Sequence, residues 1–222
     1  MDKGREHFDG IENEYEGMII KIVPSAGDFF ESVLSFVSEG KIRVLELGSG
    51  TGFVTSMVVE KNREAEITCI DLAPGMLEVA KGKPELSGAE FITGDFREVW
   101  GDGFYDLVLT TLCFHHLPDE DRAFVIAKIY NSLNKAGVFV NGDVFAAESV
   151  NEENLNIEWW RREMINSGFS HKEADLMIQK REDNSAYLDK IPDYTGKLAS
   201  SGFKDVLLPY KNRIYGVVVG FK

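Results

Sequence analysis

The stretch that decides the fold is Val44-Leu45-Glu46-Leu47-Gly48-Ser49-Gly50-Thr51-Gly52-Phe53, an apolar run that ends in three alternating glycines. The run predicts a short buried strand, and the residues after it, 53–61, predict a helix. Glycine adopts positive φ without strain, so it permits a tight turn and a close approach of a ligand to the backbone. Free N–H groups at the start of the helix favour polar or anionic ligand atoms. The turn is therefore either a nucleotide-type site, formed by Gly48, Ser49, Gly50 and Gly52, or simply a tight connection.

On both sides of this turn, short apolar runs alternate with helical patterns. Such alternation is typical of a parallel sheet with helices on both faces. The predicted strands are 42–47, 67–70, 90–93, 105–112 and 138–144. The predicted helices between them are 53–61, 74–81 and 119–133, the last capped by Asp119 or a neighbour.

Two further strands, 203–209 and 214–221, are only a few residues apart, which suits an antiparallel hairpin and not a parallel crossover. The predicted fold class is therefore α/β, with a Rossmann-like seven-stranded sheet. The sheet is mostly parallel, has a C-terminal antiparallel hairpin, and carries helices on both faces under a helical cap.

The length of 222 residues suits a single domain, 1–222. We expect four parts within it: an N-terminal helical cap at 1–38, a cofactor-binding core at 39–149, a helical lid insertion at 150–200 and the terminal hairpin at 201–222. The cap should hold an amphipathic helix over 5–17 and a second helix from Pro24. The lid should hold helices over 152–167, 171–180 and 186–200.

Composition narrows the classes of partner. The net charge of −13 disfavours nucleic acid, because an acidic surface repels polyphosphates. The two cysteines, Cys69 and Cys113, fit small buried hydrophobes, and no C-x-x-C spacing predicts a metal site. No apolar run reaches the roughly 18 residues that a membrane span needs. We expect a cytoplasmic protein without membrane contact, and homo-oligomer formation stays open.

Acidic residues follow the next two predicted strands. Asp71 is placed to accept hydrogen bonds from two ribose hydroxyls, although it could also cap the helix that begins near Pro74. Gly94-Asp95-Phe96 could bind an adenine, with the carboxylate on its exocyclic amine and the ring of Phe96 packed on the base; a plain surface turn is the alternative. Three consecutive strands thus end in residues suited to a ligand, at the sheet edge where open α/β sheets bind one.

Taken together, the motifs at 44–52, 70–77, 91–96, 105–118 and 131–139 resemble those of class I S-adenosylmethionine-dependent methyltransferases. The resemblance covers about residues 8–222. It implies that the chain binds S-adenosylmethionine, or S-adenosylhomocysteine as product, and transfers a methyl group to an acceptor, with a small molecule as the default.

The resemblance also implies roles for residues at matching positions. The glycine turn would line the methionine part, and Glu46 would approach the amino group, often through water. Asp71 would hold the ribose, while Asp95 and Phe96 would recognise the adenine. The remaining expected cofactor-binding residues are Tyr15, Leu72, Met76, Gly94, Thr111 and Leu112, of which the last two would lie under the sulfonium. Glu46 and Ser49 replace an aspartate and a cysteine that are common in relatives, and both changes keep the chemistry.

His115 and His116 are the catalytic candidates, because they follow the fourth strand near the expected position of the methyl group. A histidine there could take a proton from the nucleophile. The alternative is structural, with one ring packed on the sheet and the other at the helix start near Pro118. Asp143 and Trp159 are weaker candidates for lining the pocket, and Trp159-Trp160 also fits simple helix packing.

Three other functions stay open. Residues 15–30 are similar to carboxy-S-adenosylmethionine synthases. A nicotinamide-dependent reductase is disfavoured because Phe53 occupies a position where the G-x-G-x-x-G pattern needs glycine. A non-catalytic adenosyl-binding module would keep the cofactor site and lack turnover.

Overall fold

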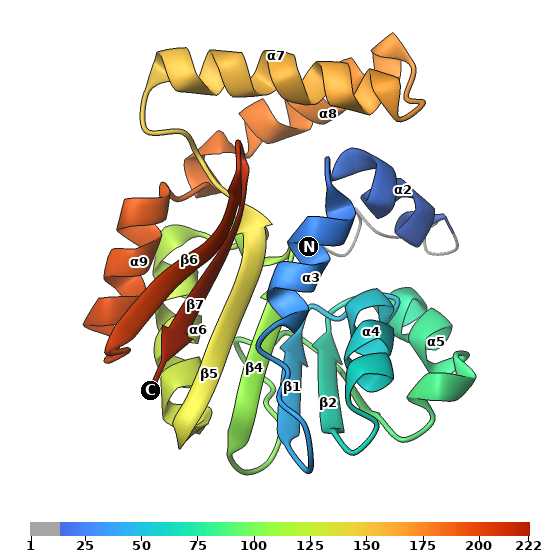
Figure 1. Cartoon of the computed structure of the whole chain (residues 1–222), viewed down its shortest axis with the longest axis vertical. Helices are drawn as coiled ribbons and strands as arrows, with labels where there is room; N and C mark the ends of the chain where they lie inside the picture. Colours follow the sequence, from blue (N-terminus) through green and yellow to red (C-terminus); the bar gives the residue numbers. More distant parts are fainter. Residues whose placement is uncertain (1–13) are drawn as a thin grey trace.

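A computed structural model of the protein describes residues 14–222, and at its centre is one seven-stranded sheet (Figure 1). The strand order is β3-β2-β1-β4-β5-β7-β6, in which β7 is antiparallel to both of its neighbours and all other pairs are parallel. The strands are β1 (Arg43–Leu47), β2 (Glu66–Asp71), β3 (Glu90–Thr93), β4 (Tyr105–Thr111), β5 (Leu133–Val144), β6 (Asp205–Asn212) and β7 (Tyr215–Phe221). The predicted fold class, with its terminal antiparallel hairpin, is confirmed.

Helices cover both faces of this sheet. On one face, α3 (Ala26–Leu34) and α4 (Phe53–Lys61) bury Phe29, Val33 and Val58 in the larger hydrophobic core. On the other face, α6 (Asp119–Ser132) and α9 (Ile191–Ser200) bury a second core. The helix α5 (Pro74–Lys81) follows β2, with Pro74 in its first turn as predicted, where the missing N–H costs no hydrogen bond.

Three helices lie beyond the carboxyl ends of the parallel strands (Figure 1). They are α2 (Tyr15–Ile22), α7 (Val150–Asn166) and α8 (His171–Asp183). The end of α2 is fixed from two distant parts of the chain, because the carbonyl of Ile22 accepts hydrogen bonds from Trp160 Nε1 and Tyr215 Oη, both at 2.9 Å. Ser167 Oγ also donates to the carbonyl of Lys21 at 2.7 Å. The end of α2 is thereby joined to α7 and β7.

Several predicted boundaries were wrong. The helix predicted over 5–17 ends later, because α2 runs from Tyr15 to Ile22; its predicted start falls in residues 1–13, which lie outside the described part. β5 begins at Leu133 and not at Val138, because Leu133 pairs with Tyr105 across a register shift that takes up the expected turn.

Two details of the helices also differ. The predicted helix over 186–200 is split into a short 3-10 turn, Ser185–Tyr187, and α9, which begins at Ile191 because Pro192 is confined to a first helical turn. Asp119 does not cap α6: Pro118 holds the N-cap position without a side-chain cap, and Asp119 pairs with Lys197.

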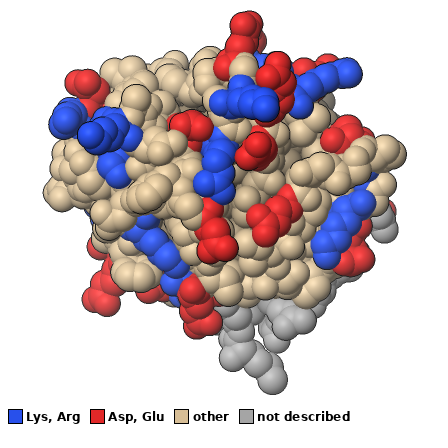
Figure 2. Space-filling model, turned by 90° about the horizontal axis from the view of Figure 1, so that it is seen from below, with Lys and Arg blue, Asp and Glu red and all other residues tan. Residues whose placement is uncertain are grey.

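Among residues 14–222, no helix is both long and apolar enough to cross a membrane. On the face seen from below in Figure 2, basic and acidic side chains are interspersed.

Candidate functional site

A cavity of about 830 Å³ lies at the carboxyl ends of the parallel strands. Ligand pockets of drug-sized molecules span roughly 300–1,000 Å³, so this cavity is near the top of that range. The predicted site residues that line it are Tyr15, Gly48, Asp71, Leu72, Asp95, Phe96, Leu112, His115 and His116. Its other walls come from α2, α7, α8 and the start of β7.

The remaining predicted residues, Glu46, Ser49, Gly50, Gly52, Met76, Gly94 and Thr111, are not part of the lining. Met76 is buried in α5, and Ser49 is buried in the glycine turn. Their roles toward a cofactor stay predictions.

The glycine turn has the backbone that its sequence predicts. Gly48, Gly50 and Gly52 have φ of 70°, 55° and 73°, a region that other residues adopt only with strain. A Cβ at Gly48 would lie 2.3 Å from Cys113 Sγ, so this position also requires glycine for space. Asp71 braces the turn, since its Oδ2 accepts the N–H of Gly50 at 2.7 Å.

Asp71 is not the cap of α5, because Ala73 holds the N-cap position without a side-chain cap. Its Oδ1 accepts the N–H of Ala73 at 2.8 Å, just before Pro74. A carboxylate offers about four acceptor positions, so two backbone contacts leave room for two hydroxyl donors. Burial raises the pKa of Asp71, while the backbone hydrogen bonds from Ala73 and Gly50 oppose the rise.

Glu46 is a buried carboxyl without a cationic partner at hydrogen-bond distance among residues 14–222. Its Oε2 accepts a hydrogen bond from Thr55 Oγ1 at 2.6 Å. Burial raises the pKa of Glu46 to about 8, although the hydrogen bond from Thr55 opposes the rise. A buried carboxyl of this kind is suited to accept an ammonium group from a ligand, because the cation would stabilise its charged form.

We therefore expect S-adenosylhomocysteine to bind this chain more tightly as the pH rises from 6 to 8. Below a pKa of about 8 Glu46 is protonated, so pairing with the ligand's ammonium expels a proton and favours higher pH. The affinity should rise by up to about tenfold per pH unit, and then fall above pH ~8, where an α-amino group loses its own proton. Calorimetry across this range measures both limbs.

Glu46→Gln is the matched variant, because an amide keeps the hydrogen bond to Thr55 and cannot titrate. It should bind more weakly at pH 8 and lose the rising limb between pH 6 and 8. A wild-type affinity that stays flat over that interval would place the amino group away from Glu46.

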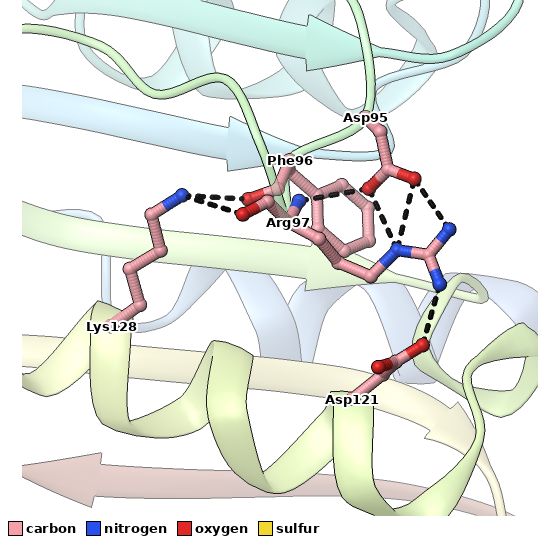
Figure 3. A network of polar contacts seen from close by, with 5 residues as sticks. All are labelled: Asp95, Phe96, Arg97, Asp121 and Lys128. Atoms are coloured by element: carbon pink, nitrogen blue, oxygen red, sulfur yellow. Dashed lines mark hydrogen bonds and ion pairs between the residues drawn. The ribbon is translucent and has the colours of Figure 1, made fainter.

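Asp95 is held in a network of charged groups (Figure 3). Its Oδ2 accepts from Arg97 Nε at 2.9 Å and from Arg97 Nη2 at 2.5 Å, and Arg97 Nη1 pairs with Asp121 at 2.5 Å. Lys128 Nζ donates to the carbonyls of Phe96 and Arg97. Burial works to raise the pKa of Asp95, but the hydrogen bonds from Arg97 outweigh it and hold the pKa below its usual value.

This network was not expected from the sequence. It fixes Asp95 in the ionised, hydrogen-bond-accepting state at the edge of the cavity, beside the ring of Phe96. Arg97 also donates to Asp95 Oδ1 from its backbone N–H at 2.8 Å and from Nε at 3.0 Å, so it fills about four acceptor positions of the carboxylate. The predicted contact of Asp95 with an adenine amine would compete with these bonds.

Leu112 occupies a strained position at the end of β4. Its φ is +49°, a left-handed conformation that costs a non-glycine residue roughly 1–2 kcal/mol. The backbone N–H of Leu112 is held by the carbonyl of Gly142 at 2.8 Å, and the residue lines the cavity. Strain of this kind concentrates at functional sites, which favours the predicted place of Leu112 near the reacting group.

His115 is oriented by Asp143. The imidazole Nδ1 lies 2.6 Å from Asp143 Oδ1, and the backbone N–H of His115 donates to Asp143 Oδ2 at 3.1 Å. The carboxylate fixes Nδ1 as the protonated nitrogen, so Nε2 is left as the basic one. His116 packs beside it, with ring centroids 3.9 Å apart and ring planes tilted by 45°. Asp143 itself lines a small chamber behind His115 and not the large cavity.

Residues of the lid complete the site, and the sequence did not single out most of them. Trp160, and not the predicted Trp159, lines the cavity, together with Met177, Lys180 and Arg181. The apolar residues of α7 and α8 follow the helical period only weakly, so the sequence does not predict which face of each helix is turned to the cavity. That orientation depends on the tertiary packing.

The comparisons with known proteins agree with this geometry. Residues 44–137 match the methyltransferase domain family. A malonyl-[acyl-carrier protein] O-methyltransferase of Acetivibrio thermocellus is 28% identical over 158 residues, which are 71% of this chain and 54% of that protein. This chain thus spans about half the length of that relative.

Two other similar proteins match nearly from end to end. A carboxy-S-adenosyl-L-methionine synthase of Campylobacter lari is 25% identical over 234 residues, covering 100% of this chain and 96% of that protein. The solved DhpI–SAH complex shares the fold, with a TM-score of 0.68 and 16% identity over 96% of this chain and 92% of that one.

The sheet order and the cavity define a Rossmann-like α/β protein that binds its ligand at the carboxyl ends of parallel strands. Within that class, residues 44–137 are similar to the methyltransferase domain family, and the similar DhpI structure is a complex with SAH.

Proposed function

We propose that this chain binds S-adenosylmethionine in the large cavity and transfers its methyl group to a small-molecule acceptor. The observation that supports this most strongly is the composition of one cavity. Residues from the ends of β1, β2, β3 and β4 form one side, and residues of α2, α7 and α8 form the other. The first set suits an adenosyl ligand, and the second leaves space for an acceptor.

The residues present fit the cofactor chemically. Asp71 offers oxygens for ribose hydroxyls, and Leu72 and Phe96 offer apolar surface for a base. Within the described residues 14–222, buried Glu46 has no cationic partner at hydrogen-bond distance. When bound, S-adenosylmethionine supplies an electrophilic methyl group on a sulfonium. The part of the protein in such a transfer is to position the acceptor and exclude water.

We assign His115 as the group that takes the acceptor's proton. As the acceptor's heteroatom bonds to the methyl carbon, its proton passes to Nε2 of His115, and the bond between carbon and sulfur breaks. Asp143 then stabilises the imidazolium through Nδ1. The cap at 1–38 and the lid at 150–200 are proposed to enclose the acceptor.

The test is a turnover assay with S-adenosylmethionine and a panel of small acceptors, read as formation of S-adenosylhomocysteine. For an acceptor that must lose a proton, we expect His115→Gln to lower kcat by about 100-fold, the low end of general-base effects. Binding of S-adenosylhomocysteine should stay within a few-fold of wild type. Binding without turnover across the panel would instead identify an adenosyl-binding module.

A second candidate is a carboxy-S-adenosylmethionine synthase-like activity. It is favoured by the similarity to the Campylobacter lari enzyme, which runs the whole length of both proteins. Mass spectrometry of the nucleoside released from the freshly purified protein separates the two. A carboxylated sulfonium would support this candidate, and only the unmodified cofactor or its thioether product would contradict it.

A further inference from the structure

The part of the cavity away from the strand ends is largely apolar. Its walls include Ile22 at the end of α2 and Val23 after it, Trp160 and Met177 of the lid, and Ile214 before β7. An apolar wall of this kind excludes water and selects a ligand with an apolar body.

Charged groups enter this region at the end of α8, where Lys180, Arg181 and Asp183 line the cavity. Arg181 already has partners within the protein. It is 8% exposed, pairs with Glu153 at 2.8 Å and donates to the carbonyl of Phe145 at 2.8 Å. Asp183 is exposed and accepts a hydrogen bond from Gln179.

Lys180 is different. Its side chain is half-buried, and within residues 14–222 its ammonium has neither an ion pair nor a hydrogen bond. A cation beside an apolar wall gains most from a partner of opposite charge, because the local dielectric is lower than that of water. Its carbon stem can contact the apolar part of the same ligand.

We propose that the part of the cavity away from the strand ends binds a ligand that carries one carboxylate on an apolar body, with the carboxylate paired to Lys180. The proposal rests on the proposed function, since it names the substrate class of the same cavity. The carboxylate could belong to the acceptor or to a carboxylated form of the donor, and both sources use the same pairing.

The test titrates hexanoate and its neutral counterpart hexan-1-ol into the protein saturated with S-adenosylhomocysteine. We expect hexanoate to bind about tenfold more tightly, which is the fold-change that one charge-assisted hydrogen bond provides. Lys180→Met should remove this preference, and Lys180→Arg should retain it. Lys172→Met is the matched control, because Lys172 is an exposed lysine of α8 outside the cavity lining.

A second arm compares carboxy-S-adenosylmethionine with S-adenosylmethionine in wild type and in Lys180→Met. Tighter binding of the carboxylated ligand than of its neutral counterpart, lost in Lys180→Met, supports the proposal in either arm. The arm that shows this difference identifies the source of the carboxylate. Equal binding of charged and neutral ligands in both arms, or a preference that survives Lys180→Met, would overturn it. If S-adenosylhomocysteine itself does not bind, the proposed function fails, and the hexanoate comparison is still made on the unliganded cavity.

Discussion

Replacing Asp71 by alanine is expected to weaken the binding of S-adenosylhomocysteine by at least about 100-fold. A hydrogen bond to a charged group contributes roughly 1.5–3 kcal/mol, so losing two ribose contacts is sufficient for this factor. The variant also loses the bonds from Asp71 to the N–H groups of Gly50 and Ala73, at 2.7 and 2.8 Å, which hold the glycine turn in place. Calorimetry or equilibrium dialysis measures the affinity directly.

Asp71→Asn separates the two roles, because an amide can still accept one backbone N–H while offering fewer acceptors to the ribose. Its affinity should lie between those of wild type and Asp71→Ala. Asp205→Ala serves as the control, since Asp205 is an exposed carboxylate at the start of β6, away from the cavity. An Asp71→Ala protein that is folded and binds within about threefold of wild type would show that the ribose lies elsewhere.

Replacing Arg122 by alanine is expected to have the largest effect on stability. This arginine is 2% exposed, and its guanidinium pairs with Asp189 at 2.5 Å. It also donates to the carbonyl of Leu117 at 2.7 Å, and further to those of Phe114 and Tyr187. Its loss leaves these carbonyls without this donor and leaves Asp189 with Lys197, 2.5 Å away, as its remaining cation. Breaking a buried pair costs about 3–5 kcal/mol.

For a chain of this length, each kcal/mol lowers Tm by roughly 2–4 °C, so thermal unfolding should shift by about 6–20 °C. The exposed pair of Arg161 with Asp175 provides the control, and Arg161→Ala should leave Tm nearly unchanged. Because Arg122 holds the carbonyls on both sides of His115 and His116, turnover at temperatures where the variant is folded should also fall. A Tm close to that of wild type would show that the network is dispensable.

The fold could be predicted well wherever local sequence and tertiary structure agree. The helices α4 and α5 and the strand β3 have the predicted bounds, because glycine, proline or polar residues end each apolar pattern. The start of β5 could not be predicted, since Lys135-Ala136-Gly137 has the composition of a turn and lies in a register shift, between Leu133, which pairs with Tyr105, and Val138, which pairs with Leu107. The last helix begins at Ile191 and not at residue 186, because Pro192 fits only the first turn of a helix.

The site divides in the same way. The side of the cavity that suits the cofactor could be predicted, because the glycine turn and Asp71 directly follow predicted strands, and parallel strands end at the same edge of a sheet. The ion pairs of Asp95 with Arg97 and of Arg122 with Asp189 could not be read from spacing, because they depend on side-chain direction and on contacts across many residues. The places of Lys180 and Trp160 in the cavity wall could not be predicted either, because they depend on how α7 and α8 are oriented over the sheet.

The two hydrogen bonds to the carbonyl of Ile22 also bear on the order in which the protein acquires its binding competence. Their donors, Trp160 and Tyr215, lie 138 and 193 residues further along the chain. During synthesis the start of α2 can pair early, because Glu16 bonds to Thr51 and Lys83, but its end lacks both of these hydrogen bonds until the lid and β7 have been added. The part of the cavity wall at Ile22 is therefore completed late, so a nascent chain that stops before β7 retains the sheet motifs without an enclosed site.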